Sequence, residues 1–290
     1  MYTDMFGKKR FKLGLHQHTT RSDGGLEPAE VAALYREHGY DAIALTDHWV
    51  YGAAQTLSDL PIFAGAEYHV GVRDAGDGEG VFHIVCLFTD REPTLSRETA
   101  TAQGIIDAIH AAGGIAVLAH PGWSMNTSER VKALKGFDAT EIFNTLSNNT
   151  RRGDSSMLID HYALNGQIFP LIAADDYHRP AYGIPPTSFI MVESEDLSPA
   201  NIKKAILEKR FYASMGPEIH LTRQGDTMVV DCSPVREVVF ESNLVLSPNR
   251  ARVGEGITHA EYPLNPSERF VRAYVTDSEG KQAWSNFIEI

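Results

Sequence analysis

Histidine and carboxylate side chains recur in short groups through the first 180 residues. Imidazole and carboxylate ligands suit zinc, manganese or iron, and no thiolate is involved. One ion needs about four to six ligands, so a larger set predicts a cluster of two or three divalent ions. The nine candidate metal ligands are His16 and His18 in LHQH, Asp23 in RSDGG, His48 in TDH, Glu67 in GAE, His83 in FH, His120 in AHPGW, and Asp176 and His178 in DDYH.

Each of these groups has a simpler interpretation when it is taken alone. A single histidine at a strand end is more often a hydrogen-bonded structural residue than a ligand. A D-x-H sequence can be an Asx-turn followed by a solvated histidine. So many polar groups near a folded core would nevertheless be costly to bury without partners. Their recurrence in one chain therefore favours a metal site.

Several neighbouring residues are expected to lie outside the ligand set. His69 follows Glu67 by two residues on an extended segment, so we expect it beside the metal ligands. Asp47 and Asp175 are adjacent to predicted ligands and are expected to support the site. The remaining histidines are expected to be structural or exposed: His38, His110, His161, His220 and His259.

The elements before the ligands must position them. Seven apolar runs predict strands, and helical patterns lie between several of them. This alternation predicts parallel strands in an α/β barrel, with an open doubly wound sheet as the alternative. Except for His83, each ligand ends or follows a predicted strand, where barrel enzymes place their sites. The predicted strands are 11–15, 42–46, 62–67, 82–88, 115–119, 139–143 and 168–173, and the predicted helices are 28–38, 96–112, 128–134, 155–165 and 199–209.

The pattern changes near Tyr212, where the helical period disappears. Short β-type runs separated by turn formers follow it. We therefore predict a hydrolase domain over 1–212 and a small antiparallel β domain over 217–290, with Trp284 in the core of the β domain. The predicted β runs are TMVVDCS, REVVFES, NLVLS, FVRAYVT and AWSNFIEI.

Composition narrows the expected partners. The chain has a formal net charge of -12 and no long run of Lys and Arg. Such a surface repels nucleic acid and anionic membranes. No apolar stretch approaches the length of about 20 residues that a membrane-spanning helix needs, and no signal sequence is recognisable. Cys86 and Cys232 lie in apolar surroundings and are expected to be reduced, so we expect a cytoplasmic protein.

The order of the motifs HQH, SDGG, TDH, GAE, FH, AHPGW and DDYH resembles the PHP (polymerase and histidinol phosphatase) family over residues 11–212. The resemblance implies a distorted (β/α)7 TIM-like barrel with a trinuclear metal site. Several members of the family have a histidine at the Asp23 position. The tail, with FYASMGPEI, is similar to the β extension of some stand-alone members. The implied ligands are His16, His18, Glu67 and Asp176 for the first metal, Glu67, His83 and His120 for the second, and Asp23, His48 and His178 for the third.

The resemblance implies a phosphoesterase that acts on a small phosphate ester. Three divalent ions, three carboxylates and a hydroxide carry a net charge of about +2, which suits a phosphomonoester dianion. We expect a metal-bridging hydroxide to attack phosphorus, with Glu67 as the bridging ligand and His178 as a second catalytic residue. Arg179 is the first candidate for binding the phosphate and Arg21 the second. Trp123 is expected to pack beside the site.

Two other functions fit the same residues. The metals could activate water against a carboxylic ester, an amide or a carbamate, since these reactions also use Lewis-acid metals and hydroxide. Alternatively, the chain could be a non-catalytic metal-binding scaffold whose β domain binds a partner. The scaffold hypothesis predicts tight metal binding without turnover.

Overall fold

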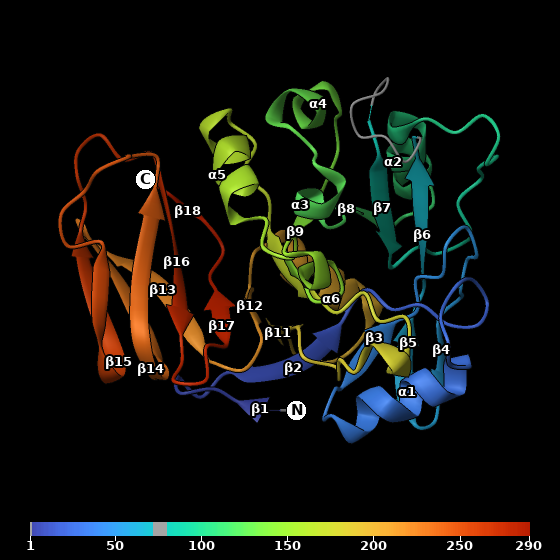
Figure 1. Cartoon of the computed structure of the whole chain (residues 1–290), viewed down its shortest axis with the longest axis horizontal. Coiled ribbons are helices and arrows are strands. Elements are labelled where there is room, and N and C mark those ends of the chain that lie inside the picture. Colours follow the sequence, from blue (N-terminus) through green and yellow to red (C-terminus); the bar gives the residue numbers. More distant parts are fainter. Residues whose placement is uncertain (1, 72–79) are drawn as a thin grey trace.

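The computed structural model of this protein describes residues 2–71 and 80–290. Its strands form two β-sheets. The larger sheet has thirteen strands and the smaller has five. In Figure 1 the C-terminal strands, coloured orange to red, gather at one end of the molecule. The prediction of a mixed α/β fold is confirmed. None of the helices in these two ranges combines the length and the apolar character needed to cross a membrane.

The larger sheet runs in the order β13-β14-β16-β17-β12-β11-β2-β3-β5-β4, with β1 beside β2, β15 beside β14 and β18 beside β16. Its strands are β1 (Tyr2–Thr3), β2 (Lys9–Gly14), β3 (Ala42–Ala44), β4 (Gln55–Leu57), β5 (Leu60–Phe63), β11 (Phe189–Glu193), β12 (Phe211–Ser214), β13 (Ile219–Gln224), β14 (Thr227–Ser242), β15 (Ala251–Pro263), β16 (Phe270–Thr276), β17 (Gln282–Trp284) and β18 (Ile288–Glu289).

The smaller sheet runs in the order β10-β9-β8-β7-β6. Two isolated parallel bridges connect the sheets. One joins Gln17, which follows a strand of the larger sheet, to Tyr177, which follows a strand of the smaller one. The other joins His48, which also follows a strand of the larger sheet, to Glu67 in the smaller sheet. The strands of the smaller sheet are β6 (Gly65–Val70), β7 (Phe82–Leu87), β8 (Ile115–Leu118), β9 (Ala139–Asn144) and β10 (Leu171–Ala174).

The helices begin and end at residues with local reasons to do so. Pro28 starts α1, and the side chains of Glu27 and Glu30 form a capping box there. Thr101 accepts a hydrogen bond from the Gly104 N–H, so α2 begins six residues after the predicted start at 96. The helices are α1 (Pro28–Glu37), α2 (Ala102–Ala111), α3 (Pro121–Ser124), α4 (Ser128–Ala133), α5 (Ser156–Leu164) and α6 (Pro199–Leu207), with short 3-10 helices at Ser147–Thr150 and Pro180–Tyr182.

The expectation of uniformly parallel strands is wrong for β7. That strand pairs antiparallel with both β6 and β8, whereas β2, β3 and β5 pair in parallel, as do β8, β9 and β10. The predicted strand 62–67 is also two strands. It is interrupted at Ala64, so that β5 belongs to the larger sheet and β6 to the smaller one.

The C-terminal part is antiparallel as expected, but its strands differ from the prediction. The runs TMVVDCS and REVVFES form one 16-residue strand, β14. The run NLVLS is not a strand, because Val245 and Leu246 are 99% and 88% exposed in a loop. Strand β15 was not predicted, because it is largely exposed and its charged residues and two glycines hide any alternation.

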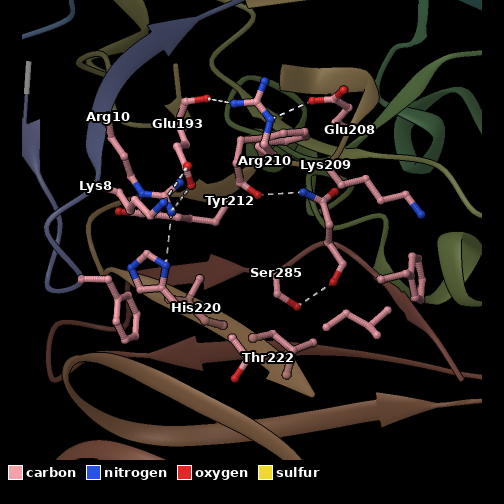
Figure 2. A pocket seen from close by; sticks show the side chains of 17 residues that line it. Lys8, Arg10, Glu193, Glu208, Lys209, Arg210, Tyr212, His220, Thr222 and Ser285 are labelled. Atoms are coloured by element: carbon pink, nitrogen blue, oxygen red, sulfur yellow. Dashed lines mark hydrogen bonds and ion pairs between the residues drawn. The ribbon is translucent and has the colours of Figure 1, made fainter. Parts of the chain in front are cut away.

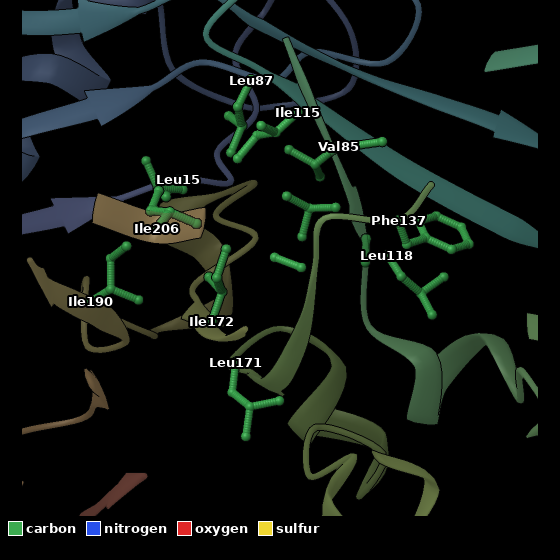
Figure 3. Close-up of a cluster of buried hydrophobic side chains, with 14 of the residues drawn as sticks. Leu15, Val85, Leu87, Ile115, Leu118, Phe137, Leu171, Ile172, Ile190 and Ile206 are labelled. Carbon is green, nitrogen blue, oxygen red and sulfur yellow. The ribbon is translucent and has the colours of Figure 1, made fainter. Parts of the chain in front are cut away.

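A shared apolar core lies between the two sheets. Leu15, beyond the end of β2, and Ile190 of β11 belong to the same buried cluster as Val85 of β7 and Leu118 of β8 (Figure 3). Trp284 of β17 belongs to this cluster too, because its ring stacks on Phe143 of β9 with a centroid distance of 5.4 Å. Trp284 therefore packs against the smaller sheet rather than in a separate β-domain core.

The C-terminal strands continue the larger sheet directly. Strand β17 pairs with β12 on one side and with β16 on the other. A cavity of about 520 Å³ at this junction is lined by Lys8, Arg10, Glu193 and His220, among others (Figure 2). Arg10 Nε donates to Asp4 Oδ2 at 2.6 Å, and Arg10 also forms an ion pair with Glu193 at 3.8 Å. Lys8 and Arg10 at this junction therefore each form an ion pair with a carboxylate.

Candidate metal centre

A buried carboxylate, Glu67, lies at the centre of a group of imidazoles. Its side chain is 1% exposed, and five histidine nitrogens lie between 2.7 and 3.3 Å from its two oxygens. Burial opposes its negative charge, but the histidines outweigh burial and hold the pKa of Glu67 well below its usual range. The five histidines are His16, His18, His48, His83 and His120.

The sheets bring these side chains together from distant parts of the chain. His16 and His18 follow β2, and their two-residue spacing on extended backbone turns both rings the same way, with centroids 5.2 Å apart. His48 follows β3 and is bridged to Glu67. Glu67 itself lies inside β6 and does not end a strand as the sequence predicted, because β6 continues to Val70.

His83 is the predicted ligand near the start of its strand. Since β7 runs antiparallel to β8, the start of β7 lies beside the end of β8. The Ala119 N–H donates to the His83 carbonyl at 3.1 Å, which places His120 next to His83. The two rings have a centroid distance of 4.9 Å. The reversed direction of β7 therefore brings His83 to the same edge as the other ligands.

One group of four atoms has the spacing of a tetrahedral metal site. His16 Nε2 and His18 Nε2 lie 3.2 Å apart, and each lies 3.1 to 3.4 Å from Glu67 Oε2 and from Asp176 Oδ1. Ligands at about 2.0–2.1 Å from a tetrahedral ion are separated by about 3.4 Å. All four side chains are buried. The group therefore fits one divalent ion.

Two further groups share residues with the first. Glu67 Oε1 lies 2.7 Å from His83 Nδ1 and 3.3 Å from His120 Nε2. Asp23 lies near the ring nitrogens of His18, His48 and His178 at 3.4 to 3.8 Å. The Asp23 side chain is 50% exposed, so this third group faces the solvent. The three groups place all nine predicted ligands in one connected cluster.

The charge distribution of the cluster suits cations. Burial opposes a charge on His18, but Asp176 and Glu67 raise its pKa to about 9. Burial dominates at His48 and lowers its pKa to about 4, despite the nearby Glu67. His18 therefore holds a proton at neutral pH, and a metal ion could replace that proton.

The residues present fit divalent metal ions. Glu67 Oε2, Asp176 Oδ1 and His48 Nδ1 are buried and form no hydrogen bond of normal geometry among the described residues. Buried polar atoms of this kind are costly unless they have a partner. Because imidazole and carboxylate ligands suit zinc, manganese and iron, ions of this kind would give these side chains a partner.

Glu141 supports the site and was not predicted. Its carboxylate lies 2.7 Å from His16 Nδ1 and accepts a hydrogen bond from the His120 N–H at 2.8 Å. A carboxylate on the far nitrogen of a ligating histidine fixes the ring and raises its basicity. The available signal was the single charged residue inside the apolar run ATEIF.

The other predicted neighbours lie close to the cluster. Asp47 accepts hydrogen bonds from the Thr19 and Ser22 hydroxyls, which holds the loop that carries Asp23. Asp175 instead accepts hydrogen bonds from Tyr35 and Tyr40, as well as from backbone groups after the cluster. Both carboxylates therefore support the backbone of the site.

The loop of Asp23 also depends on Gly24. A Cβ atom there would lie 2.5 Å from the backbone nitrogen of Thr19, so a larger residue would clash with the backbone. Trp123 packs edge-on against His83 and His120, with centroid distances of 5.5 and 5.1 Å, and is 41% exposed. It therefore presents an aromatic edge beside the cluster.

The predicted phosphate-binding arginines are both exposed. The Arg179 guanidinium donates to the Asp23 carbonyl at 3.3 and 3.4 Å, next to His178. Arg21 lies in the same loop as Asp23, with one guanidinium nitrogen near Gly52. Both arginines thus lie near the group of Asp23, His48 and His178. Their role in substrate binding stays a prediction.

The fold resembles those of several solved structures. A two-domain protein from Bacteroides vulgatus ATCC 8482, which contains a predicted PHP-like metal-dependent phosphoesterase, is 16% identical over 100% of this chain and 97% of its own, with a TM-score of 0.52. An amidohydrolase from Chromobacterium violaceum is 18% identical over 69% of this chain and 96% of its own, with a TM-score of 0.49. The chain matches no family model and no curated protein.

A third structure, the lesion-specific endonuclease PfuEndoQ from Pyrococcus furiosus, is 16% identical over 69% of this chain and 56% of its own, with a TM-score of 0.48. Among these, the likeness to the B. vulgatus protein extends over both chains almost completely. The resemblance predicted from the motifs is therefore confirmed at the level of the fold.

Proposed function

From its PHP-like metal-dependent phosphoesterase fold, we propose that this chain is a metal-dependent phosphoesterase that hydrolyses a small phosphate ester. The observation that carries the proposal is the convergence of five histidines on the buried carboxylate of Glu67. A structural cluster would not require so many imidazoles around one carboxylate, one oxygen of which accepts no hydrogen bond of normal geometry among the described residues. The alternative of a solvated or structural histidine set accounts poorly for this arrangement.

Two or three divalent ions would occupy the cluster, with zinc, manganese and iron as the candidates. When bound, such ions supply Lewis-acid stabilisation of phosphoryl oxygens and lower the pKa of water. The proposed ligands are His16, His18, Glu67 and Asp176 for one ion, Glu67, His83 and His120 for a second, and Asp23, His48 and His178 for a third. Glu67 takes part in two of the three sets.

The protein's own groups orient these ligands. His178 Nδ1 lies 2.8 Å from the Asp176 carbonyl, so this nitrogen donates and Nε2 is left free to accept. His16 is oriented in the same way by Glu141. We propose that the exposed Arg179 and Arg21 contact the phosphate beside His178, because the third group is the one that faces solvent. The net charge of -12 favours a small ester over nucleic acid as the substrate.

The two sheets are proposed to form the distorted (β/α)7 barrel that the motifs imply. The shared core and the two bridges that connect the sheets beside the ligands support this proposal. A division into a hydrolase domain at 1–212 and a β domain at 217–290 stays a prediction, and so does a cytoplasmic location.

The proposal is tested by assaying the metal-loaded protein on p-nitrophenyl phosphate, bis-p-nitrophenyl phosphate, nucleotides and naphthyl carbamates. We expect phosphate ester hydrolysis that falls by at least about a hundredfold in Glu67→Gln, because a direct ligand is lost. Glu98→Gln, a change to an exposed carboxylate outside the cluster, is the control. Cleavage of carbamates without any phosphoester hydrolysis would assign the alternative reaction. Tight metal binding without turnover of any substrate would favour the scaffold hypothesis.

A further inference from the structure

His69 lies outside the nine predicted ligands but directly against them. It is paired with His83 in the antiparallel register of β6 and β7. Residues opposite each other in such a pair project from the same face of the sheet. The two rings accordingly lie with their centroids 5.0 Å apart. The strand register therefore fixes a pair of imidazoles at the edge of the cluster.

A third imidazole, that of His48, completes a triangle with this pair. Its ring centroid lies 4.9 Å from that of His69 and 5.5 Å from that of His83. Three imidazoles on one tetrahedral ion, with metal–nitrogen distances of about 2.0–2.1 Å, have centroids about 5 Å apart. One nitrogen from each ring lies within 4.8 Å of the others. The spacing therefore suits a common ion after small side-chain rotations.

Two of the three rings have a buried nitrogen that forms no hydrogen bond of normal geometry among the described residues, although His48 Nδ1 lies 3.1 Å from Glu67 Oε2. His69 Nδ1 and His48 Nδ1 form no hydrogen bond of normal geometry with any described residue. A structural histidine would normally satisfy such an atom with a carbonyl or a carboxylate. Trp49 packs edge-on against the His69 ring at 6.1 Å and supplies no acceptor. His69 Nδ1, for which no such contact exists among the described residues, is therefore available to a cation.

We propose that His48, His69 and His83 form an alternative metal position, beside the carboxylate of Glu67, whose three ligands are all imidazoles. All-nitrogen sites of this kind favour Cu²⁺ and Zn²⁺, whereas carboxylate-rich sites suit Mn²⁺ better. The position shares His48 with the group around Asp23 and His83 with the pair formed by Glu67 and His120. An ion held by the three histidines therefore competes with those groups for two side chains. Zn²⁺ or Cu²⁺ would then occupy the three-histidine position, whereas Mn²⁺ would occupy the groups that contain carboxylates.

The test uses the full chain, freed of metal with a chelator and titrated separately with Zn²⁺ and Mn²⁺. The variants are His69→Asn and His69→Gln, with His161→Asn as a matched histidine change away from the cluster. We expect both His69 variants to weaken binding of one zinc ion by at least about tenfold, because a direct ligand is lost. Manganese binding should stay within about twofold of the wild type, because the carboxylate-containing groups are intact.

Electron paramagnetic resonance of the Cu²⁺-loaded protein gives a second readout. The wild type and His161→Asn should share a spectrum with nitrogen couplings that lose one contributor in the His69 variants. Unchanged zinc binding and unchanged copper spectra would overturn the proposal. An equal loss of zinc and manganese would also overturn it, because His69 would then support the whole cluster. Neither readout measures hydrolysis, so the result is separate from the outcome for the proposed phosphoesterase activity.

Discussion

At the scale of single residues, the cluster depends on side chains that do not themselves face the proposed metal ions. Glu141 is the clearest case, because it contacts both the ring of His16 and the backbone of His120. It is 1% exposed and also accepts a hydrogen bond from Asn144 at 2.8 Å. One carboxylate thus fixes the orientation of two ligands from different strands.

Replacing Glu141 with Gln should lower metal affinity by about 10- to 100-fold, because an amide orients the His16 ring less strongly. Competition with a chromophoric chelator would measure this change. Glu98→Gln is the control, since Glu98 is exposed and its carboxylate contacts Ser96. A variant of Glu141 with unchanged affinity would show that the contact with His16 is dispensable.

The metal-free protein should lose stability as the pH rises. The pKa of His18 is about 9 in the folded protein against an ordinary value of 6.5. Its contribution is therefore complete below pH 6.5 and is lost as the pH rises through about 9. Deprotonation leaves the buried carboxylates of Glu67 and Asp176 without that positive charge. Melting temperatures of chelator-treated protein should fall by at least about 4 °C over this range.

Zinc-loaded protein should show little of this loss, because the ion replaces the proton and keeps the positive charge at the carboxylates. His18→Gln should reduce the pH dependence of the metal-free protein, while His16 and His120, whose pKa values the neighbouring carboxylates also raise, keep part of it. A wild-type melting temperature that is constant from pH 6.5 to 9 would contradict the prediction.

At the scale of elements, one partly buried ion pair connects a helix beside the smaller sheet with a C-terminal strand. Arg272 of β16 donates from Nε and Nη2 to both oxygens of Asp160 in α5, at 2.7 and 2.6 Å. The Arg272 side chain is 1% exposed, while that of Asp160 is 27% exposed. The forked geometry gives two parallel hydrogen bonds.

Asp160→Asn should destabilise the protein by about 3 kcal/mol, because it leaves the buried Arg272 charge without a counterion. Arg272→Met should cost less, because it removes the charge as well as its partner. Urea unfolding followed by circular dichroism would measure both. The control is Asp59→Asn, which breaks an exposed pair with Arg36 and should cost within about 0.5 kcal/mol. Equal effects of Asp160→Asn and Asp59→Asn would contradict the prediction.

Elements were predictable where local pattern and tertiary context agree. Helix α1 and strands β2, β8 and β9 lie close to their predicted positions, because a cap or a short, mostly apolar run marks them. Strand direction was not predictable, since the reversal of β7 depends on its partners β6 and β8. The break at Ala64 was hidden for the same reason, because a continuous apolar run does not reveal a change of sheet.

The candidate ligands were more predictable than the contacts around them. His16, His18 and His48 stand out because polar residues directly follow apolar strands. Glu141 was missed because its partner His16 is 125 residues away. His69 was placed beside the site, but its pairing with His83 required the register of two antiparallel strands. Ligand types are thus local information, whereas their supporting contacts are not.

At the scale of the whole molecule, the C-terminal strands are not attached to the rest by a linker alone. Strand β17 lies between β12 and β16, and Trp284 belongs to the core that lies between the two sheets. A chain ending at Gly216 would leave the edge of β12 unpaired and part of that core exposed. Such edges promote aggregation.

We therefore expect residues 1–216 to be insoluble or to unfold without a cooperative transition. Soluble yield and a thermal melt followed by circular dichroism, compared with the full chain, would test this. A soluble fragment with a sharp melt and full zinc binding would instead show that the first part of the chain folds independently.

Strand β2 connects two distant features of the molecule. Arg10, near its start, belongs to the ion pairs at the junction with the C-terminal strands, and His16 follows its end. Six residues of extended chain separate them, which corresponds to about 20 Å. Both features therefore depend on the same strand keeping its place in the sheet. Release of the metal ions and detachment of the C-terminal strands should consequently be a single cooperative event, visible as one transition by both metal signal and tryptophan fluorescence.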